Sequence, residues 1–244
     1  MSSQTQAHGG HAAAHGHDSH SNGHSPFLQH HFAEMSQQLD ASKIGMWLFL
    51  VTEILLFGGL FVGFGIMQTK YPEAFYEAHH HLDRTLGALN TIVLLVSSFT
   101  MVMAVHSAQT SQKKKLIVYL ILTLLCAGIF LGVKYFEYDH KIHDGLLPGK
   151  FYSHKSDAVA PSALEAGEGR ARGQMIFFSF YFMMTGLHGI HILGGMVVIG
   201  WVLRRAIRGD FTSAYYTPVD LVGLYWHLVD LIWIYLFPLL YLIS

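Results

Sequence analysis

Long apolar runs separated by polar segments are the dominant pattern of this chain of 244 residues. A helix that crosses a hydrocarbon core of about 30 Å needs roughly 20 residues, and five of the runs are that long. None alternates apolar and polar residues as a membrane β-barrel requires. We therefore predict an all-α, polytopic membrane protein, a bundle of five transmembrane helices near residues 44–67, 86–105, 116–135, 174–203 and 221–243.

Composition agrees with a membrane protein, because 52% of the residues are hydrophobic and only 13% are charged. Soluble proteins average about 25% charged residues. The single cysteine, Cys126, lies within the third predicted span, so we expect no intrachain disulfide.

The segment before the first span, residues 1–43, is rich in His, Gly, Ser and Ala. Such a composition buries no core, so we predict a disordered tail. Two readings of its histidines remain open, a solvated tail without a site and loose binding of Zn, Ni or Cu. Because the first apolar run begins only at Ile44, we expect no cleavable signal peptide.

Basic residues beside the spans predict the orientation of the bundle. Five spans place the N-terminus and two compact basic clusters, "KKK" at 113–115 and "RRAIR" at 204–208, on one side. Short cytoplasmic loops are enriched in Lys and Arg, so we predict a cytoplasmic N-terminus. The arginines of the second cluster are candidates for binding lipid headgroups: Arg204, Arg205 and Arg208.

Few ionisable residues lie inside the predicted spans, and each is a candidate functional residue because charge at bilayer depth is costly. Glu53 falls near the middle of the first span. The fourth span carries His188 and His191, and the fifth carries His227 and Asp230 at the same spacing. Residues three apart share one helix face. We therefore expect the two polar faces to meet, with Asp230 bonded to an imidazole.

Three roles for these side chains remain open from the residues alone. The first is polar packing between helices, and the second is a haem b bound between His227 and either His188 or His191. The third is a proton-coupled transport site built on Glu53.

Four stretches of the sequence, taken together and in order, resemble one family. They are "TEILLFGGLFVGF", "KYFEY", "YFMMTGLHGIHILGG" and "FTSAYYTPVDLVGLYWHLVDLIWIYLF". In this order they closely resemble subunit III of cytochrome c oxidase, within the haem–copper oxidases. The resemblance covers nearly everything from Ile44 onward, and it is to a five-helix form that lacks the first two of the seven helices many members have.

The resemblance implies a non-catalytic subunit that holds no cofactor of its own, with haem and copper in the partner subunits I and II. It also implies bound phospholipid, stabilisation of the catalytic subunit and support of proton uptake during oxygen reduction. Glu53 matches the family's carbodiimide-reactive carboxyl, and Glu137 matches the glutamate of "KYFEY". The family's other intramembrane polar positions correspond to His188, His191, His227 and Asp230. These histidines are then interhelical hydrogen-bonding residues rather than haem ligands.

The resemblance leaves the electron donor open, because other subunits select it. A quinol oxidase or nitric oxide reductase subunit III is therefore the alternative. Residues 136–172 form a long loop without a helix or strand pattern, which we expect to contact cytochrome c or a neighbouring respiratory complex. We expect a partner chain, such as an extended subunit I, to cover the side left by the two missing helices. The expected location is the bacterial cytoplasmic membrane, with the mitochondrial inner membrane as the alternative, and no nucleic-acid partner.

Overall fold

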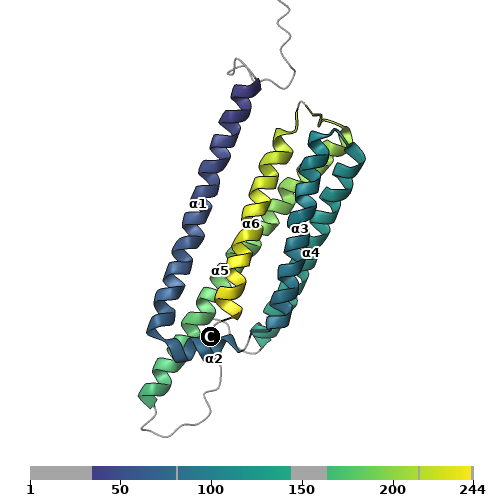
Figure 1. Ribbon diagram of the computed structural model, residues 1–244. Helices are drawn as coiled ribbons and strands as arrows, with labels where there is room; N and C mark the ends of the chain where they lie inside the picture. The colour runs from purple at the N-terminus through teal and green to yellow at the C-terminus, as the bar shows by residue number, and fades with distance from the viewer. Residues whose placement is uncertain (1–34, 81, 144–163, 214, 243–244) are drawn as a thin grey trace, which may run out of the picture.

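The computed structural model describes residues 35–80, 82–143, 164–213 and 215–242. Within these residues the chain forms six helices and no strand beyond an isolated bridge between Thr212 and Tyr215. Five helices are long and apolar enough to cross a membrane, which confirms the all-α five-span prediction (Figure 1). The helices are α1 (Met35–Lys70), α2 (Pro72–His79), α3 (Arg84–Gln109), α4 (Lys113–His143), α5 (Leu164–Arg208) and α6 (Thr217–Tyr241).

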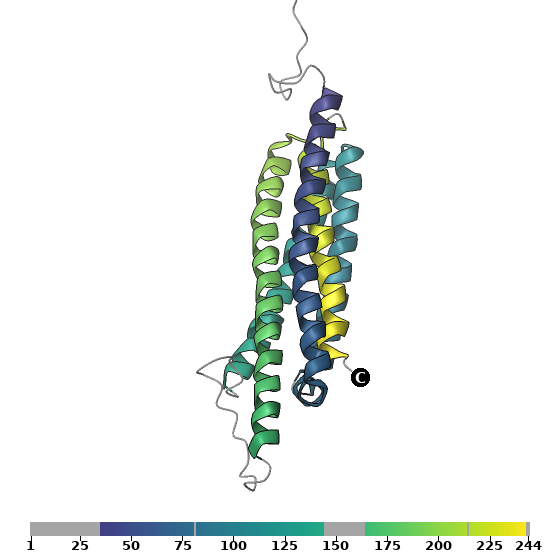
Figure 2. The same cartoon turned by 90° about the vertical axis from the view of Figure 1, so that its left-hand side faces the viewer.

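Helices α3, α4, α5 and α6 form the compact part of the bundle, and α1 packs at its side against α5 and α6 (Figures 1 and 2). The core between α4, α5 and α6 is aromatic. The Trp233 ring meets Phe130 edge-on at a centroid distance of 4.8 Å, and both side chains are buried. The outer face of α1 remains apolar and exposed, as at Trp47 (58%), Leu55 (70%) and Val62 (64%).

The helices extend further than their apolar runs predict. Helix α1 begins at Met35, so residues 35–43 form its first turns rather than part of the expected tail, and residues 1–34 lie outside the described residues. Likewise α4 continues to His143 and α5 begins at Leu164. The expectation of a loop without helix over 136–172 was therefore wrong at both ends, and 144–163 lie outside the described residues. The extension of α1 contains Gln, Leu, Ala and Lys, which favour helix even outside the membrane.

The short helix α2 was not predicted from the sequence. It lies across the end of the bundle opposite the start of α1 (Figure 1) and begins with Pro72 in its first turn, a favourable position for proline. Its buried residues Ala74, Phe75 and Ala78 pack against the core. Eight residues are too few for a clear helical period, which explains why the pattern was missed.

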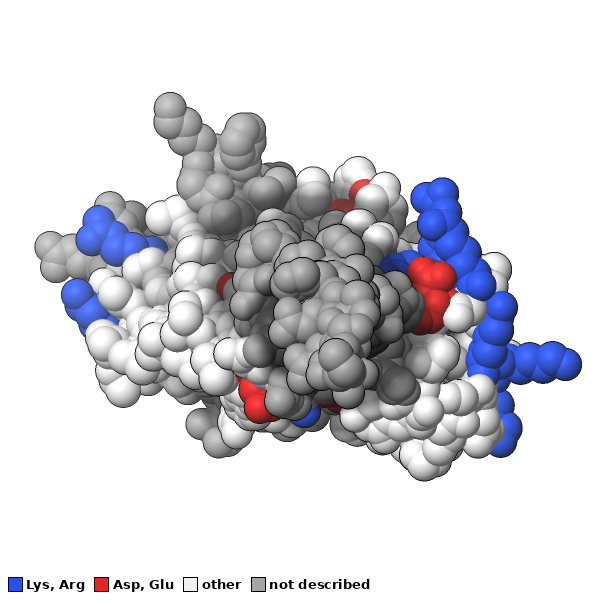
Figure 3. Space-filling view, turned by 90° about the horizontal axis from the view of Figure 1, so that it is seen from above, with Lys and Arg blue, Asp and Glu red and all other residues white. Residues whose placement is uncertain are grey.

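The start of α1, the α3–α4 turn and the α5–α6 connection lie at the same end of the bundle. Lys43 of α1 pairs with Asp220 of α6 at 4.0 Å, and Lys113 approaches Gly209. Figure 3 views this end and shows Lys and Arg side chains at two opposite edges, more of them at the right-hand edge. The clustering agrees with the predicted topology, while a cytoplasmic location of this end stays a prediction.

Candidate functional site: polar contacts inside the membrane

Glu53 and His191 form a partly buried pair between α1 and α5. The Glu53 Oε2 atom lies 2.8 Å from His191 Nε2, and each side chain is 15% exposed. His191 Nδ1 lies 2.8 Å from the Leu187 carbonyl oxygen, which can only accept, so Nδ1 carries a proton. The contact to Glu53 then holds one further proton, carried by the carboxyl or by Nε2. The pair is uncharged overall in either arrangement.

Helix α6 joins the same contact through Tyr225. Its hydroxyl donates to the His191 backbone carbonyl oxygen at 2.9 Å. The Phe57 ring packs edge-on against the His191 imidazole, with centroids 5.4 Å apart. The imidazole is therefore held by Glu53 and Phe57 of α1 and the backbone of His191 by Tyr225 of α6, which leaves 15% of the side chain exposed.

His188 faces a different set of helices although it is only three residues from His191. Its fully buried imidazole stacks on Trp233 of α6 at 5.2 Å and meets Phe130 of α4 edge-on at 5.5 Å. Neither ring nitrogen has a hydrogen-bond partner among the described residues. His188 therefore acts as a packed aromatic ring in this arrangement rather than as a hydrogen-bonding residue.

His227 and Asp230 of α6 face α3 and α4 rather than the histidines of α5. The Ser98 hydroxyl of α3 lies 2.8 Å from His227 Nδ1. Asp230 is 3% exposed and lies beside Ser98 and Cys126, and its carboxyl oxygens have no hydrogen-bond partner within the described part of the chain. The expected bond between Asp230 and an imidazole of α5 is therefore wrong.

The packing of α5 against α6 explains why Asp230 and His227 do not meet the histidines of α5. Gly195 lies against the Trp226 ring so closely that an added Cβ would stand 2.7 Å from it. This contact and the Tyr225 hydroxyl bond occupy the α5–α6 interface. His191 is consequently turned toward α1, and His227 and Asp230 toward α3 and α4.

A second polar cluster surrounds Glu137 near the end of α4. Lys134 Nζ donates to Glu137 Oε2 at 2.7 Å, and Lys141 Nζ donates to Oε1 at 2.9 Å. The hydroxyls of Tyr181 (α5) and Tyr241 (α6) also donate to Oε1, at 3.0 and 2.6 Å. All five side chains are buried. The cluster thus ties three helices together around one carboxylate.

Sequence reasoning found Glu137 but missed its partners. Lys134 and Lys141 lie three residues before and four residues after Glu137, so all three share one face of α4. That spacing was the feature of the sequence that could have predicted the ion pairs with Glu137. A lysine near the end of a span reads as an interfacial residue that reaches toward water, and here both lysines point inward.

The three candidate lipid-headgroup arginines differ in their surroundings. Arg205 Nε donates to Asp210 at 3.0 Å, and its guanidinium lies over the Trp201 ring at 5.1 Å. Arg204 and Arg208 are exposed. The latter two are therefore better placed than Arg205 to reach lipid headgroups.

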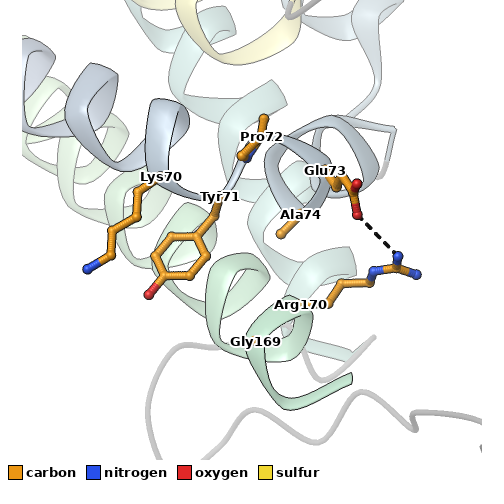
Figure 4. Close-up of a pocket in the computed structure, with 7 residues that line it drawn as sticks. All are labelled: Lys70, Tyr71, Pro72, Glu73, Ala74, Gly169 and Arg170. Atoms are coloured by element: carbon orange, nitrogen blue, oxygen red, sulfur yellow. Dashed lines mark hydrogen bonds and ion pairs between the residues drawn. The ribbon is translucent and has the colours of Figure 1, made fainter. Parts of the chain in front are cut away.

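A surface pocket of about 280 Å³ lies at the opposite end, where α2 meets α5 (Figure 4). Lys70, Tyr71 and Glu73 line one side and Arg170 the other, and Arg170 Nη2 pairs with Glu73 Oε2 at 3.4 Å. Both charged side chains are at least half exposed, so this ion pair contributes little stability. The backbones of α2 and α5 approach each other more closely at Gly173 of α5. A Cβ added there would stand 2.5 Å from the Ala74 Cβ of α2.

Within the described residues, no group of three or more His, Cys, Asp or Glu side chains is placed to hold a metal ion. The histidine-rich tail lies outside these residues. Both ring nitrogens of His191 are engaged, and Nδ1 of His227 is bonded to Ser98. His191 faces Glu53 of α1 and His227 faces Ser98 of α3, so these two histidines make interhelical contacts in different directions and do not form a ligand pair between α5 and α6.

Fold and site together define a polytopic helical membrane protein whose ionisable residues make contacts between helices. The family model described as cytochrome c oxidase subunit III matches residues 22–156 and 171–244. The chain belongs to this family, the non-catalytic third subunit of haem–copper oxidases.

Similar proteins carry two kinds of names. The chain is 28% identical over 220 residues to a quinol oxidase subunit 3 of Bacillus spizizenii, covering 87% of this chain and 93% of that protein. It is 28% identical over 210 residues to a cytochrome c oxidase subunit 3 of Thermostichus vulcanus, covering 84% and 89%. A probable cytochrome c oxidase subunit 3 of Nocardia farcinica is 28% identical over 201 residues, covering 82% and 87%.

Proposed function

We propose that the chain serves a cytochrome c oxidase, where it stabilises the catalytic subunit, retains phospholipid and supports proton uptake during oxygen reduction. The observation that carries this proposal is the match of residues 22–156 and 171–244 to the cytochrome c oxidase subunit III family, and the Glu53–His191 pair supports the stabilising role. The pair fixes α1 to the bundle from within the membrane, while the outer face of α1 stays apolar and open to a partner chain or lipid. The expected partners are subunits I and II, which would hold the haem and copper.

Purification through an affinity tag on this chain tests the proposal. We expect the subunits that carry haem and copper to co-purify in mild detergent, and this chain to lose all haem absorbance once it is separated from them. A solitary chain with a haem b spectrum would contradict the proposal. That result would identify the membrane histidines as haem ligands.

A quinol oxidase subunit III is the second candidate, favoured by the name of the Bacillus relative. The two candidates are distinguished by oxygen consumption of the purified complex. Rapid turnover with reduced cytochrome c supports the first candidate, and turnover with quinol alone supports the second.

The expected contact of residues 136–172 with cytochrome c or another respiratory complex remains a proposal. The two helices that flank 144–163 project past the apolar spans, which supports an extramembrane contact at that end of the bundle. Deletion of residues 153–167 should weaken donor binding or complex association. Unchanged donor kinetics and unchanged assembly would rule the contact out.

Our proposed location is the bacterial cytoplasmic membrane, with the start of α1 on the cytoplasmic side. The native Cys126 is buried, so an introduced cysteine can report the sidedness. In intact cells, a membrane-impermeant maleimide should label Arg170→Cys and leave Lys114→Cys unlabelled until the membrane is opened. The reverse pattern would invert the topology.

A further inference from the structure

A groove of about 310 Å³ opens between α3 and α6 at the end of the bundle where α1 begins. Three of its polar side chains, His106, Gln109 and Asp220, lie near the end of α3 and the start of α6. His227 lines the same groove seven residues further along α6, about 10 Å deeper at 1.5 Å per residue. The groove therefore carries polar groups from the membrane boundary to an imidazole within the α6 span.

Lys43 of α1 stands beside the mouth of this groove. Its ammonium lies 4.0 Å from the Asp220 carboxylate, and both side chains are partly exposed. Such an ion pair is weak because water still solvates both charges. The mouth of the groove is therefore suited to hold water.

The inner end of the groove leads to a buried acid. His227 Nδ1 lies 2.8 Å from Ser98 Oγ of α3, and Asp230 lies beside the same hydroxyl. Asp230 is 3% exposed, and its carboxyl oxygens have no hydrogen-bond partner within the described helices. Its titratable neighbour on α4 is Cys126, which supplies no positive charge. Because charge at bilayer depth is costly, Asp230 is held as a neutral acid that has a proton to exchange.

An aromatic side chain closes the path beyond Asp230. Trp233 follows one turn later on α6, and its indole N–H donates to Thr91 of α3 at 3.1 Å. The Lys134 ammonium of the Glu137 cluster lies over the same ring, 4.6 Å from its centroid. An indole donates a hydrogen bond but accepts none, so it does not relay a proton from Asp230 to the Glu137 cluster.

We propose that the α3–α6 groove is a proton entry path that leads from the end of the bundle where α1 begins to Asp230, and that it ends there. Groove water gives a proton to His227 Nε2 while the Nδ1 proton passes to Ser98 Oγ, and the Ser98 hydroxyl proton passes to the Asp230 carboxylate. The imidazole gains one proton and loses one, and a flip of its ring restores the first tautomer. The inference rests on the support of proton uptake proposed above and gives that role a location and a side.

Hydrogen–deuterium exchange at Asp230 tests the path in the intact, resting complex. Deuteration shifts the infrared carbonyl stretch of a protonated carboxyl, and comparison with Asp230→Asn identifies the part of the band that belongs to Asp230. In deuterated water this part should shift completely. Ser98→Ala should slow the shift at least about tenfold, because a positioned proton carrier is removed. Ser98→Thr restores a hydroxyl and should recover the rate, which a merely structural role of Ser98 would not predict.

Val102→Phe tests the groove itself. Val102 of α3 lines the groove and is 49% exposed, so a larger ring fills the groove without displacing the core. Val96→Phe is the matched control, because Val96 is 47% exposed on the same helix and lies outside the groove. Exchange at Asp230 should slow several-fold in Val102→Phe and keep the rate of the unaltered complex in Val96→Phe. Equal rates in the two variants would overturn the entry path.

Three other outcomes would contradict the proposal or its premise. A carboxyl band that is the same with and without Asp230 would show an ionised Asp230 and overturn the site. A proton leak through vesicles that hold the resting complex, abolished by Ser98→Ala, would overturn the closed end. If Ser98→Ala loses fast exchange but keeps full haem content and normal proton uptake during turnover, the path stands and the proposed support of proton uptake fails.

Discussion

Glu53 of α1 and His191 of α5 lie 2.8 Å apart within the membrane, although they are 138 positions apart in the sequence. The proton count at His191 shows that the two side chains share one proton and carry no net charge together. A neutral pair is tolerated in the bilayer where either ion alone would be costly. The contact therefore positions α1 without adding charge to the membrane.

A double-mutant cycle measures this contact. We expect Glu53→Ala and His191→Ala each to destabilise the subunit, and the double variant to lose less than the sum. The coupling free energy should be about 0.6 to 2 kcal/mol, as for other polar contacts in membranes. Retention of the subunit in the complex during titration with SDS provides the measurement. Thr52→Ala is the control, since the Thr52 hydroxyl bonds only to its own helix at Phe49, and additive losses would contradict a direct contact.

Glu53→Gln separates structure from proton exchange. The amide retains volume and hydrogen bonding but cannot titrate. If Glu53 supports proton uptake, the variant should assemble normally and show slower turnover or faster inactivation during turnover. Unchanged turnover, pumping and longevity of the complex would assign Glu53 a structural role alone.

Glu137→Gln should be among the most damaging single substitutions in the chain. It removes the carboxylate that two buried lysines share, and breaking a buried ion pair costs about 3 to 5 kcal/mol. Asp139→Asn is the control, because Asp139 is exposed and contacts only His143, so its loss should stay within about 0.5 kcal/mol. SDS titration of the purified complex compares the two. Adding Lys134→Met to Glu137→Gln should recover part of the loss, and a double variant worse than the single would contradict the charge argument.

Gly195→Ala should destabilise the α5–α6 interface by about 1 to 3 kcal/mol, the usual effect of overpacking. Its Cβ would stand 2.7 Å from the Trp226 ring. Gly200→Ala, five residues along the same helix, meets nothing within 4 Å and should be neutral. Trp226 fluorescence and SDS resistance report the difference. Equal behaviour of the two variants would show that α5 and α6 are not in close contact here.

The end of the bundle that carries α2 should weaken in acid. Burial lowers the pKa of His79 below its ordinary value of 6.5, and the neighbouring His80 and Arg84 lower it further. Arg84 Nη2 donates to His79 Nε2 at 2.7 Å, which requires a neutral imidazole. Because the unfolded segment binds a proton more readily, the contribution of His79 is present above about pH 6.5 and is lost as the pH falls toward its folded pKa.

Hydrogen exchange measures this effect locally. The backbone amides of α2 should exchange faster at pH 5.5 than at pH 7.5, after correction for the intrinsic pH dependence. His79→Gln cannot gain the charge and should remove most of the difference. An equally large difference in His79→Gln would assign the acid sensitivity to another group.

The sequence predicted the five spans and the family, because both depend on long apolar runs and on motifs in a fixed order. It could not predict which helices the polar residues face. His188 and His191 share a broad face of α5, yet this face spans two boundaries, one with α1 and one with α4 and α6. Small differences in helix rotation decide between them, and these depend on local fits such as Gly195 against Trp226.

The lysines of the Glu137 cluster show a second limit. An apolar run marks where a helix lies in the bilayer, but a basic residue at the end of the run suits either the boundary or an interior ion pair. Lys134 Nζ donates to the Tyr241 hydroxyl of α6 and to Glu137, and this carboxylate also accepts from the Tyr181 hydroxyl of α5. Only the assembled bundle brings these groups together.

The packing of α1 against the last two helices has a consequence for synthesis in the cell. The ribosome makes α1 first, while its main neighbours α5 and α6 are made last. At about 5 to 20 residues per second, His191 follows Glu53 after roughly 7 to 28 seconds. During that interval the nascent chain holds an unpaired carboxyl at bilayer depth. Insertion factors or a waiting partner subunit would have to shelter α1, and a chain truncated after α4 should be a substrate for quality-control proteolysis.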